Sequence, residues 1–307
     1  MSLYPVKYMS LRLLLALALA LALALVSPLA SPAFAADQDR PERIVAVGGV
    51  ITEIIYALGA EDRIVGVDST SLHPADALAT HPNVGYVRAL SAEGVLSLAP
   101  DRVIAVEAAG PPDALALVAQ AGVRVETVSE ELSLQGIVAR ILDIGEMVER
   151  PSEARALADD VSRAFAELDA HRAVIDKPLR VLFVLSLQNG RAMVGGRDTS
   201  ADAVIKLAGA VNAAAAIEGF KPITDEAIIA AAPDVILTID RGDHALSPED
   251  VFSLPAFSAT PAAGTRNLIA MDGLYLLGFG PRMPAAIADL MGRLYPGSAV
   301  AAQETPR

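Results

Sequence analysis

The sequence predicts an α/β protein of two doubly wound, Rossmann-like lobes joined by a single long α-helix. Three observations predict this fold. Short β-branched runs alternate with helical segments in both halves of the chain, one long amphipathic segment separates the halves, and the halves share a repeated pattern. Such alternation is typical of parallel sheets covered by helices, which is the doubly wound arrangement.

The strands of both halves are short, continuous apolar runs, as expected for buried parallel strands. In the first half they are Arg43–Val47, Arg63–Asp68, Arg102–Val106 and Arg124–Val128, with helical patterns near residues 51–59, 91–98 and 112–121. In the second half they are Arg180–Ser186, Asp234–Asp240 and Asn267–Asp272, with helices near 200–209, 224–232 and 283–294.

A long helix is expected between the halves, from Pro151 to about Ile175. Proline suits the first turn of a helix, and apolar residues then recur at steps of three and four, which makes one face apolar. These residues are Ala154, Leu157, Val161, Phe165 and Leu168. We therefore predict an N-terminal lobe at residues 37–150, a connecting helix at 151–176 and a C-terminal lobe at 177–307.

The two halves resemble diverged copies of one unit. Each contains a glutamate, Glu93 in the first half and Glu226 in the second, that lies seven residues before a Pro-Asp pair and a strand. Two equivalent lobes on a helical connector indicate a clamshell, in which a ligand is held in the cleft between the lobes.

The first 36 residues predict an export signal. Lys7 and Arg12 precede an unbroken Leu/Ala run, Leu13–Val26, and Ala33-Phe-Ala35 forms a small-x-small cleavage pattern. The apolar run has 14 residues, short of the roughly 20 that a spanning helix needs. The chain has no cysteine to carry a lipid anchor. We therefore expect a soluble protein without a membrane anchor in a Gram-negative periplasm.

Composition and motifs argue against several classes of protein. The net charge of −13 offers no basic footprint for nucleic acid, and the lack of cysteine excludes disulfides and thiolate metal sites. The sequence has no Gly-x-Ser-x-Gly, Walker or Gly-x-Gly-x-x-Gly motif. We therefore expect no enzyme, and a nucleotide-dependent oxidoreductase is a poor alternative. The histidines are too scattered to indicate a zinc site: His73, His81, His171 and His244.

The stretch Asn83–Ser91 is the most informative for chemistry. Gly85 allows a tight turn, and Tyr86 and Arg88 would point the same way in an extended chain. A tyrosine phenolate is a known ligand of haem iron, and a nearby guanidinium favours its ionisation. Spacing alone favours a simpler alternative, in which Tyr86 packs on the lobe and Arg88 pairs with a carboxylate.

Several motifs in one order resemble the periplasmic haem-binding proteins of bacterial haem ABC importers, in the helical-backbone class of substrate-binding proteins. The likeness runs through nearly all of the chain after the export signal. The motifs are Val47-Gly-Gly-x-x-Thr-Glu53, Val84-Gly-Tyr-x-Arg-x-Leu-Ser-x-Glu93, Gly195-Gly-Arg-x-Thr199 with Ala201-Asp-Ala203, Gly219-Phe-Lys-Pro222 and Leu276-Leu-Gly-Phe-Gly-Pro-Arg282-x-Pro284.

The resemblance implies that one haem binds in the cleft, with Tyr86 as the axial ligand of the iron and Arg88 as the arginine that supports it. Some family members add a histidine from the second lobe. Here the corresponding segment, Ser186–Met193, has none. We therefore expect five-coordinate haem, with His244 as a less favoured second ligand.

The haem propionates require cationic donors on the second lobe or its rim, because charge-assisted hydrogen bonds would fix the orientation of haem. Arg241, just after a predicted strand, is the first choice, ahead of Lys221 and Arg282. The alternative for each of these side chains is a solvated surface charge.

The resemblance also implies a partner, because in this class of protein one exposed glutamate on each lobe meets arginines of the permease. Glu93 and Glu226 fall at these positions, although a glutamate in the first turn of a helix is also favoured by the helix dipole. The resulting expectation is a monomeric haem carrier that serves an ABC permease. The alternative within the same fold is a carrier of a ferric siderophore or of cobalamin.

Overall fold

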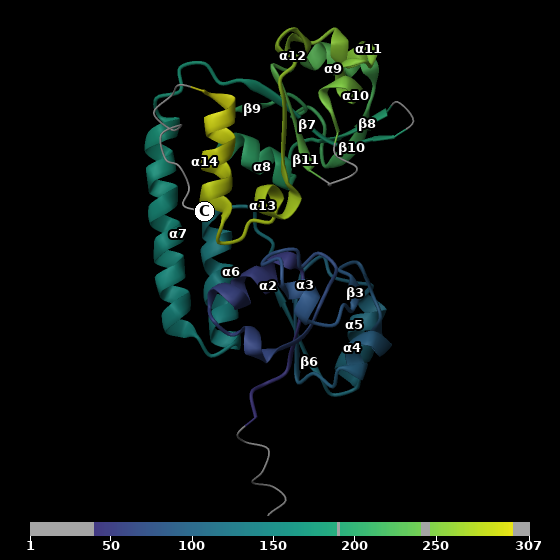
Figure 1. Cartoon of the computed structure of the whole chain (residues 1–307), viewed down its shortest axis with the longest axis vertical. Helices are drawn as coiled ribbons and strands as arrows, with labels where there is room; N and C mark the ends of the chain where they lie inside the picture. Colours follow the sequence, from purple (N-terminus) through teal and green to yellow (C-terminus); the bar gives the residue numbers. More distant parts are fainter. Residues whose placement is uncertain (1–39, 189–190, 241–245, 297–307) are drawn as a thin grey trace, which may run out of the picture. The chain divides into compact units, whose positions relative to one another are not determined.

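The computed structural model describes residues 40–188, 191–240 and 246–296, so the expected export signal lies outside the described residues. The N-terminal lobe contains a four-stranded, wholly parallel sheet of order β2-β1-β5-β6 (Figure 1). Its strands are β1 (Ile44–Val47), β2 (Ile64–Val67), β5 (Arg102–Val106) and β6 (Arg124–Val128). These confirm the four predicted strands: β1, β2 and β5 are largely buried, as their apolar character requires, whereas the edge strand β6 is mostly half-buried or exposed.

The other elements of this lobe lie between and after the strands. They are α2 (Gly49–Ala57), η2 (Glu61–Arg63), α3 (Ala77–Thr80), the two-stranded hairpin β3 (Gly85–Tyr86) and β4 (Ala89–Leu90), α4 (Ala92–Ser97), α5 (Pro112–Gln120) and α6 (Leu134–Met147). Helix α6 is an addition to the predicted elements. Its start is marked by Ser133, whose side chain accepts a hydrogen bond from the backbone N–H of Gly136.

The C-terminal lobe contains a sheet of order β10-β8-β7-β11-β12, with β9 pairing with β7. Its strands are β7 (Arg180–Gln188), β8 (Arg191–Gly195), β9 (Val211–Asn212), β10 (Phe220–Ile223), β11 (Val235–Asp240) and β12 (Leu268–Asp272). The three predicted strands form the parallel part, β7-β11-β12, whereas β8 and β10 add an antiparallel edge. The sheet is therefore mixed.

The helices of the C-terminal lobe include the three that the sequence predicts. They are α8 (Ser200–Leu207), α9 (Asp225–Ala231), α10 (Pro248–Phe252), α11 (Pro255–Ser258), α12 (Pro261–Thr265), α13 (Gly273–Leu277) and α14 (Met283–Leu294). No helix among the described residues combines the length and the apolar character needed to cross a membrane.

Helix α7 (Pro151–Arg172) connects the two lobes in the sequence. It begins at the predicted proline, ends three residues before Ile175, and packs against α6 and α14 (Figure 1). Of the predicted apolar stripe, Ala154, Val161, Phe165 and Leu168 are buried, whereas Leu157 is partly buried and Ala158 is buried in addition. The predicted fold class, two α/β lobes with one long connecting helix, is confirmed.

An equivalent arginine at or next to the start of a strand makes the same hydrogen bonds in each lobe. The backbone N–H of Arg43 donates to Asp101, and its guanidinium donates to the carbonyl oxygens of Leu98 and Ala99. In the C-terminal lobe the backbone N–H of Arg180 donates to Asp234, and its guanidinium donates to the carbonyl oxygen of Ala231. The internal repeat therefore extends from the sequence pattern to equivalent hydrogen bonds.

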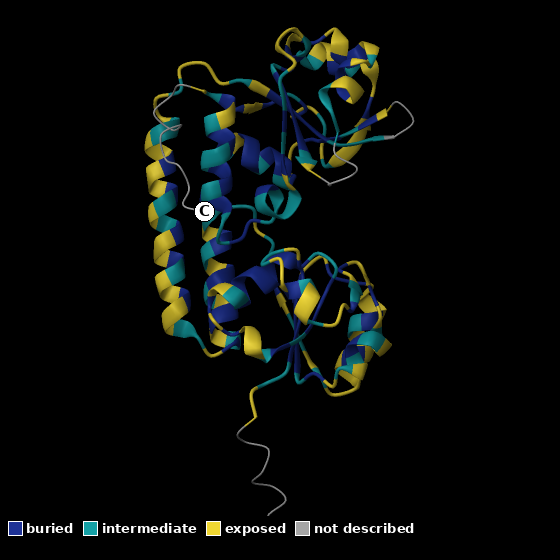
Figure 2. Cartoon of the chain, viewed as in Figure 1, coloured by how far each residue is buried: buried dark blue, intermediate teal, exposed yellow. Residues whose placement is uncertain are grey.

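Two hydrophobic clusters form the core, and one of them spans both lobes. Along β7, Val181 and Phe183 face the first cluster, whereas Leu182 and Val184 face the second, as alternation along a strand requires. The second cluster lies under α9 to α12. The first cluster continues through the inner faces of α7 and α14 into α2 and the N-terminal sheet. Figure 2 shows α2 as largely buried.

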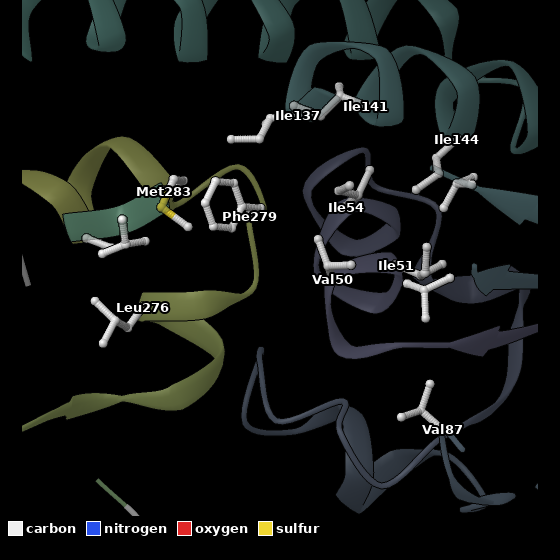
Figure 3. Close-up of a cluster of buried hydrophobic side chains, with 14 of the residues drawn as sticks. Val50, Ile51, Ile54, Val87, Ile137, Ile141, Ile144, Leu276, Phe279 and Met283 are labelled. Carbon is white, nitrogen blue, oxygen red and sulfur yellow. The ribbon is translucent and has the colours of Figure 1, made fainter. Parts of the chain in front are cut away.

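The first cluster joins the lobes at the stretch Phe279–Arg282, which we call the joint turn. Phe279 is 1% exposed and adopts a positive φ of 50°. Figure 3 shows its ring between Met283 of the C-terminal lobe and Val50 and Ile54 of α2. A phenyl ring buried among residues of both lobes fixes the chain at this point.

We predict that Phe279→Ala lowers the free energy of unfolding by roughly 3–5 kcal/mol, because it removes a buried ring and leaves a cavity between the lobes. Urea denaturation followed by circular dichroism would measure the change. Val174→Ala is the control, since Val174 is 65% exposed and its truncation should change stability by less than about 0.5 kcal/mol. A loss below about 1 kcal/mol for Phe279→Ala would contradict the shared core.

Candidate functional site

Tyr86 lies in a tight hairpin rather than in an extended segment. Gly85 pairs with Leu90 and Tyr86 pairs with Ala89, so Val87 and Arg88 form the two-residue turn. The expectation that Tyr86 and Arg88 point the same way rested on extended chain, and the reversal at the turn removes that basis. Gly85 has a φ of 107°, a conformation that glycine adopts without strain.

Loops on two sides hold the hairpin. The backbone N–H of Ser69, after β2, donates to the carbonyl oxygen of Gly85 at 2.8 Å, and the backbone of Gly110, after β5, exchanges two bonds of 2.9 Å with Val87 and Leu90. Both loops follow the carboxyl ends of parallel strands, where open α/β sheets bind their ligands. The backbone of this hairpin is therefore fixed at a position suited to a ligand.

Tyr86 differs from the other tyrosines in the described part of the chain. The hydroxyl of Tyr56 bonds with His81 at 3.0 Å, that of Tyr275 donates to Asp289 at 2.9 Å, and that of Tyr295 bonds with backbone atoms. Tyr86 is 49% exposed, and no hydrogen bond of its hydroxyl occurs within the described residues. Its oxygen is thus available to a ligand.

The pKa of Tyr275 strengthens this contrast. Burial raises its pKa well above the usual value for a phenol, and the hydrogen bond to Asp289 and the charge of that carboxylate raise it further. Tyr275 therefore remains a neutral donor at physiological pH.

Arg88 is exposed in the hairpin turn. It forms no ion pair with a carboxylate in the part of the chain that the structure describes. The simpler alternative, in which Arg88 pairs with a neighbouring carboxylate, therefore has no support among the described residues.

The three cations considered for an anionic part of the ligand lie in different settings. Arg241 lies outside the described residues, as does His244. Lys221 is exposed on the edge strand β10, and within the described residues no hydrogen bond or ion pair joins it to Tyr86 or Arg88.

Arg282 already has a partner on the opposite lobe. Its Nη2 lies 2.8 Å from Oε2 of Glu53, its backbone N–H donates to Oε1 of the same carboxylate at 3.3 Å, and its guanidinium lies 5.2 Å from the ring centre of Tyr275. The side chain of Glu53 is 6% exposed and that of Arg282 is 30% exposed. Arg282 therefore ties the joint turn to α2.

A second charged residue of the N-terminal lobe also holds the joint turn. Arg140 of α6 is 2% exposed, and its guanidinium donates to the carbonyl oxygens of Phe279 and Ser129, each at 2.7 Å. Burial lowers the pKa of Arg140, although nearby glutamates oppose this shift. Sequence reasoning assigned no role to Glu53 or Arg140. For Glu53 the available signal was a single charge within an apolar helical run, which requires a buried partner.

Glu93 and Glu226 occupy equivalent positions in the two lobes. Each is exposed in the first turn of a helix whose preceding residue, Ser91 or Thr224, accepts a hydrogen bond from the backbone as an N-cap. Neither carboxylate has an ion-pair partner among the described residues. Both are therefore free to meet a cationic partner.

Comparison with known proteins gives a consistent result. The family model described as periplasmic binding protein matches residues 44–274. The solved structure of the periplasmic heme-binding protein BhuT in complex with two hemes is 41% identical, has a TM-score of 0.79, and the match covers 86% of this chain and 100% of that chain.

Two curated relatives are more distant in sequence. The uncharacterized ABC transporter substrate-binding lipoprotein YvrC of Bacillus subtilis is 28% identical over 270 residues, covering 85% of this chain and 84% of the relative. The vitamin B12-binding protein of Vibrio cholerae is 28% identical over 218 residues, covering 71% of this chain and 76% of the relative.

The lowered pKa values of two histidines lead us to expect that stability depends on pH. Burial lowers the pKa of His73 and of His81 from the ordinary value of 6.5, so the folded state favours neutral imidazole while the unfolded chain takes up protons near 6.5. Stability is then fully present above this value and falls as the pH drops through it.

We predict a lower melting temperature at about pH 6 than at about pH 7.5, measured by differential scanning calorimetry. In His81→Gln the side-chain amide can still bond with Tyr56 but does not titrate, so the dependence on pH should be smaller. A melting temperature that rises on acidification, or a variant with the full wild-type dependence, would contradict this assignment.

Proposed function

The chain belongs to the periplasmic binding protein family, and from this premise we propose that it captures haem in the periplasm and delivers it to the permease of a haem ABC importer. The observation that carries the proposal is Tyr86, an exposed tyrosine with an available hydroxyl on a firmly held hairpin. The identity of 41% with a heme-binding protein supports the same ligand.

The chemistry of Tyr86 suits ferric haem. A phenolate oxygen is a hard, anionic ligand of the kind that holds ferric haem iron. Arg88 lies two residues away in the turn of the same hairpin, and we assign it the role of supporting this ligand. With no histidine in Ser186–Met193, we propose five-coordinate iron bound by Tyr86 alone, and His244 stays the less favoured second ligand.

The haem propionates would be bound by cations of the C-terminal lobe. Arg241 remains our first choice, and exposed Lys221 is the second. Arg282 is the least favoured of the three, because its guanidinium is already paired with Glu53 through Nη2.

Cobalamin is the alternative solute that the comparisons favour, since several curated relatives are vitamin B12-binding proteins. Cobalamin contains no ferric iron for a phenolate, so the available hydroxyl of Tyr86 favours haem. A ferric siderophore keeps the iron and stays the other alternative within this fold.

Delivery requires a docking surface, and we propose that Glu93 and Glu226 provide one carboxylate on each lobe for arginines of the permease. We further propose that residues 1–36 are a cleaved export signal, that the lobes comprise residues 37–150 and 177–307, and that the mature protein acts as a monomer in the periplasm.

We predict that haemin titration of the mature protein saturates at one haem per chain and gives a ferric–tyrosinate charge-transfer band. Tyr86→Phe keeps the ring but removes the oxygen, so the band should disappear and the affinity should fall by at least about tenfold. Tyr56→Phe is the matched control, because that hydroxyl is already bonded to His81, and it should bind haem as wild type does.

Either of two results would overturn part of this proposal. Haem binding that Tyr86→Phe leaves unchanged would remove Tyr86 as the ligand while retaining the carrier role. A wild-type protein that ignores haemin but binds cyanocobalamin or a ferric siderophore would replace haem with that solute.

We predict that the double variant Glu93→Ala/Glu226→Ala binds haem normally but delivers it poorly. Loss of both carboxylates removes the charge pairing to the permease, so uptake into proteoliposomes containing the cognate permease and ATPase should fall by roughly tenfold. Glu153→Ala is the matched control, since Glu153 is likewise an exposed first-turn glutamate, in α7. Unchanged uptake by the double variant would contradict the docking role.

A further inference from the structure

Leu72 is an apolar residue whose exposure calls for an explanation because of where it lies. It follows β2 in the N-terminal lobe and is 54% exposed. A single exposed leucine is ordinary on a protein surface, and Leu117 of α5 is 54% exposed as well. Three features distinguish Leu72. Its loop is held by hydrogen bonds, this loop is bonded to the Tyr86 hairpin, and the residue lies on the side of the lobe that faces the C-terminal lobe.

A buried carboxylate holds the Leu72 loop. Asp68 has no exposed surface, and its oxygens accept hydrogen bonds from the backbone N–H groups of Gly48 at 2.8 Å and Thr70 at 2.9 Å and from the hydroxyls of Thr70 at 2.7 Å and Ser71 at 3.2 Å. The Ser71 hydroxyl also bonds with that of Thr52 at 2.8 Å. Leu72 therefore extends from a fixed backbone.

The same loop is bonded to the hairpin that carries Tyr86. The Ser69 N–H donates to the carbonyl oxygen of Gly85 at 2.8 Å, and the N–H of Val84 donates to Val67 at 2.9 Å. Leu72 lies three residues after one partner of the first bond, and Tyr86 lies one residue after the other. The exposed side chains of Leu72 and Tyr86 therefore extend from segments whose backbones are hydrogen-bonded to each other.

The loop also lies against the C-terminal lobe. A Cβ at Gly49 would lie 2.2 Å from the carbonyl oxygen of Thr70 and 3.1 Å from Cδ1 of Leu274 in α13. His73, the next residue after Leu72, is close enough to Arg282 and Asp272 for their charges to act on it. Leu72 is therefore on the side of the N-terminal lobe that meets the other lobe.

We propose that Leu72 is a specificity-determining residue that packs on the apolar macrocycle of the haem whose iron is bound by Tyr86. This inference rests on the proposed function. A porphyrin ring is a flat apolar surface, so an aliphatic side chain beside the iron ligand gains by removing both surfaces from water. The contact selects for an apolar macrocycle, whereas Tyr86 selects for the metal.

The test compares haemin binding by the mature wild-type protein, Leu72→Ala and Leu117→Ala. We expect Leu72→Ala to weaken haemin binding roughly fivefold, since about half of a leucine side chain is left without its contact. The charge-transfer band should persist, because the iron ligand is intact. Leu72→Met, which restores apolar area, should recover most of the affinity, and Leu117→Ala should bind as wild type does. Melting temperatures of all four proteins would show that each is folded.

The outcomes separate this inference from the function on which it rests. If the wild type binds haemin and Leu72→Ala binds it equally well, the inference is wrong and the carrier function stands. An equal loss in Leu117→Ala would also overturn it, because the effect would then not depend on position. A wild type that fails to bind haemin removes both the function and the inference.

Discussion

The burial of the joint turn between the lobes is the constraint on which the rest of the structure depends. Phe279 is packed among apolar residues of both lobes, and the buried side chains of Arg140 and Glu53 bond to the backbone of the same turn. Apolar burial holds the turn in place, and the hydrogen bonds define its conformation. The joint turn therefore connects the lobes in addition to helix α7.

The charges at this joint follow from the cost of burying polar groups. An ionised side chain in an apolar interior is tolerated only with a partner, and Glu53 and Arg140 each lie in helices whose other buried residues are uncharged. Glu53 pairs with Arg282 of the opposite lobe, and Arg140 bonds to Phe279 of that lobe as well as to Ser129 of its own. This pairing engages the guanidinium of Arg282 with Glu53.

The ligand-binding surface proposed here follows from the parallel sheet of the N-terminal lobe. Loops after β2 and β5 converge at the carboxyl ends of the strands and hold the β3–β4 hairpin between them. Rigid backbone bonding leaves the side chains of Tyr86 and Leu72 exposed on one connected surface. Such a preorganised surface needs little reordering when a flat ligand binds, and this limits the entropic cost of binding.

The sequence by itself determined the fold class, the parallel strands of both lobes and the start of α7, because these depend on local apolar patterns and on motifs. Strands β5 and β6 and helix α14 match their predicted bounds. The tertiary structure alone decided the turn at Arg88 and the pairing of Arg282 with Glu53. The latter residues are 229 positions apart, and no local pattern specifies which of several cations meets a buried carboxylate. Only the packing of one lobe against the other brings Arg282 next to the buried carboxylate.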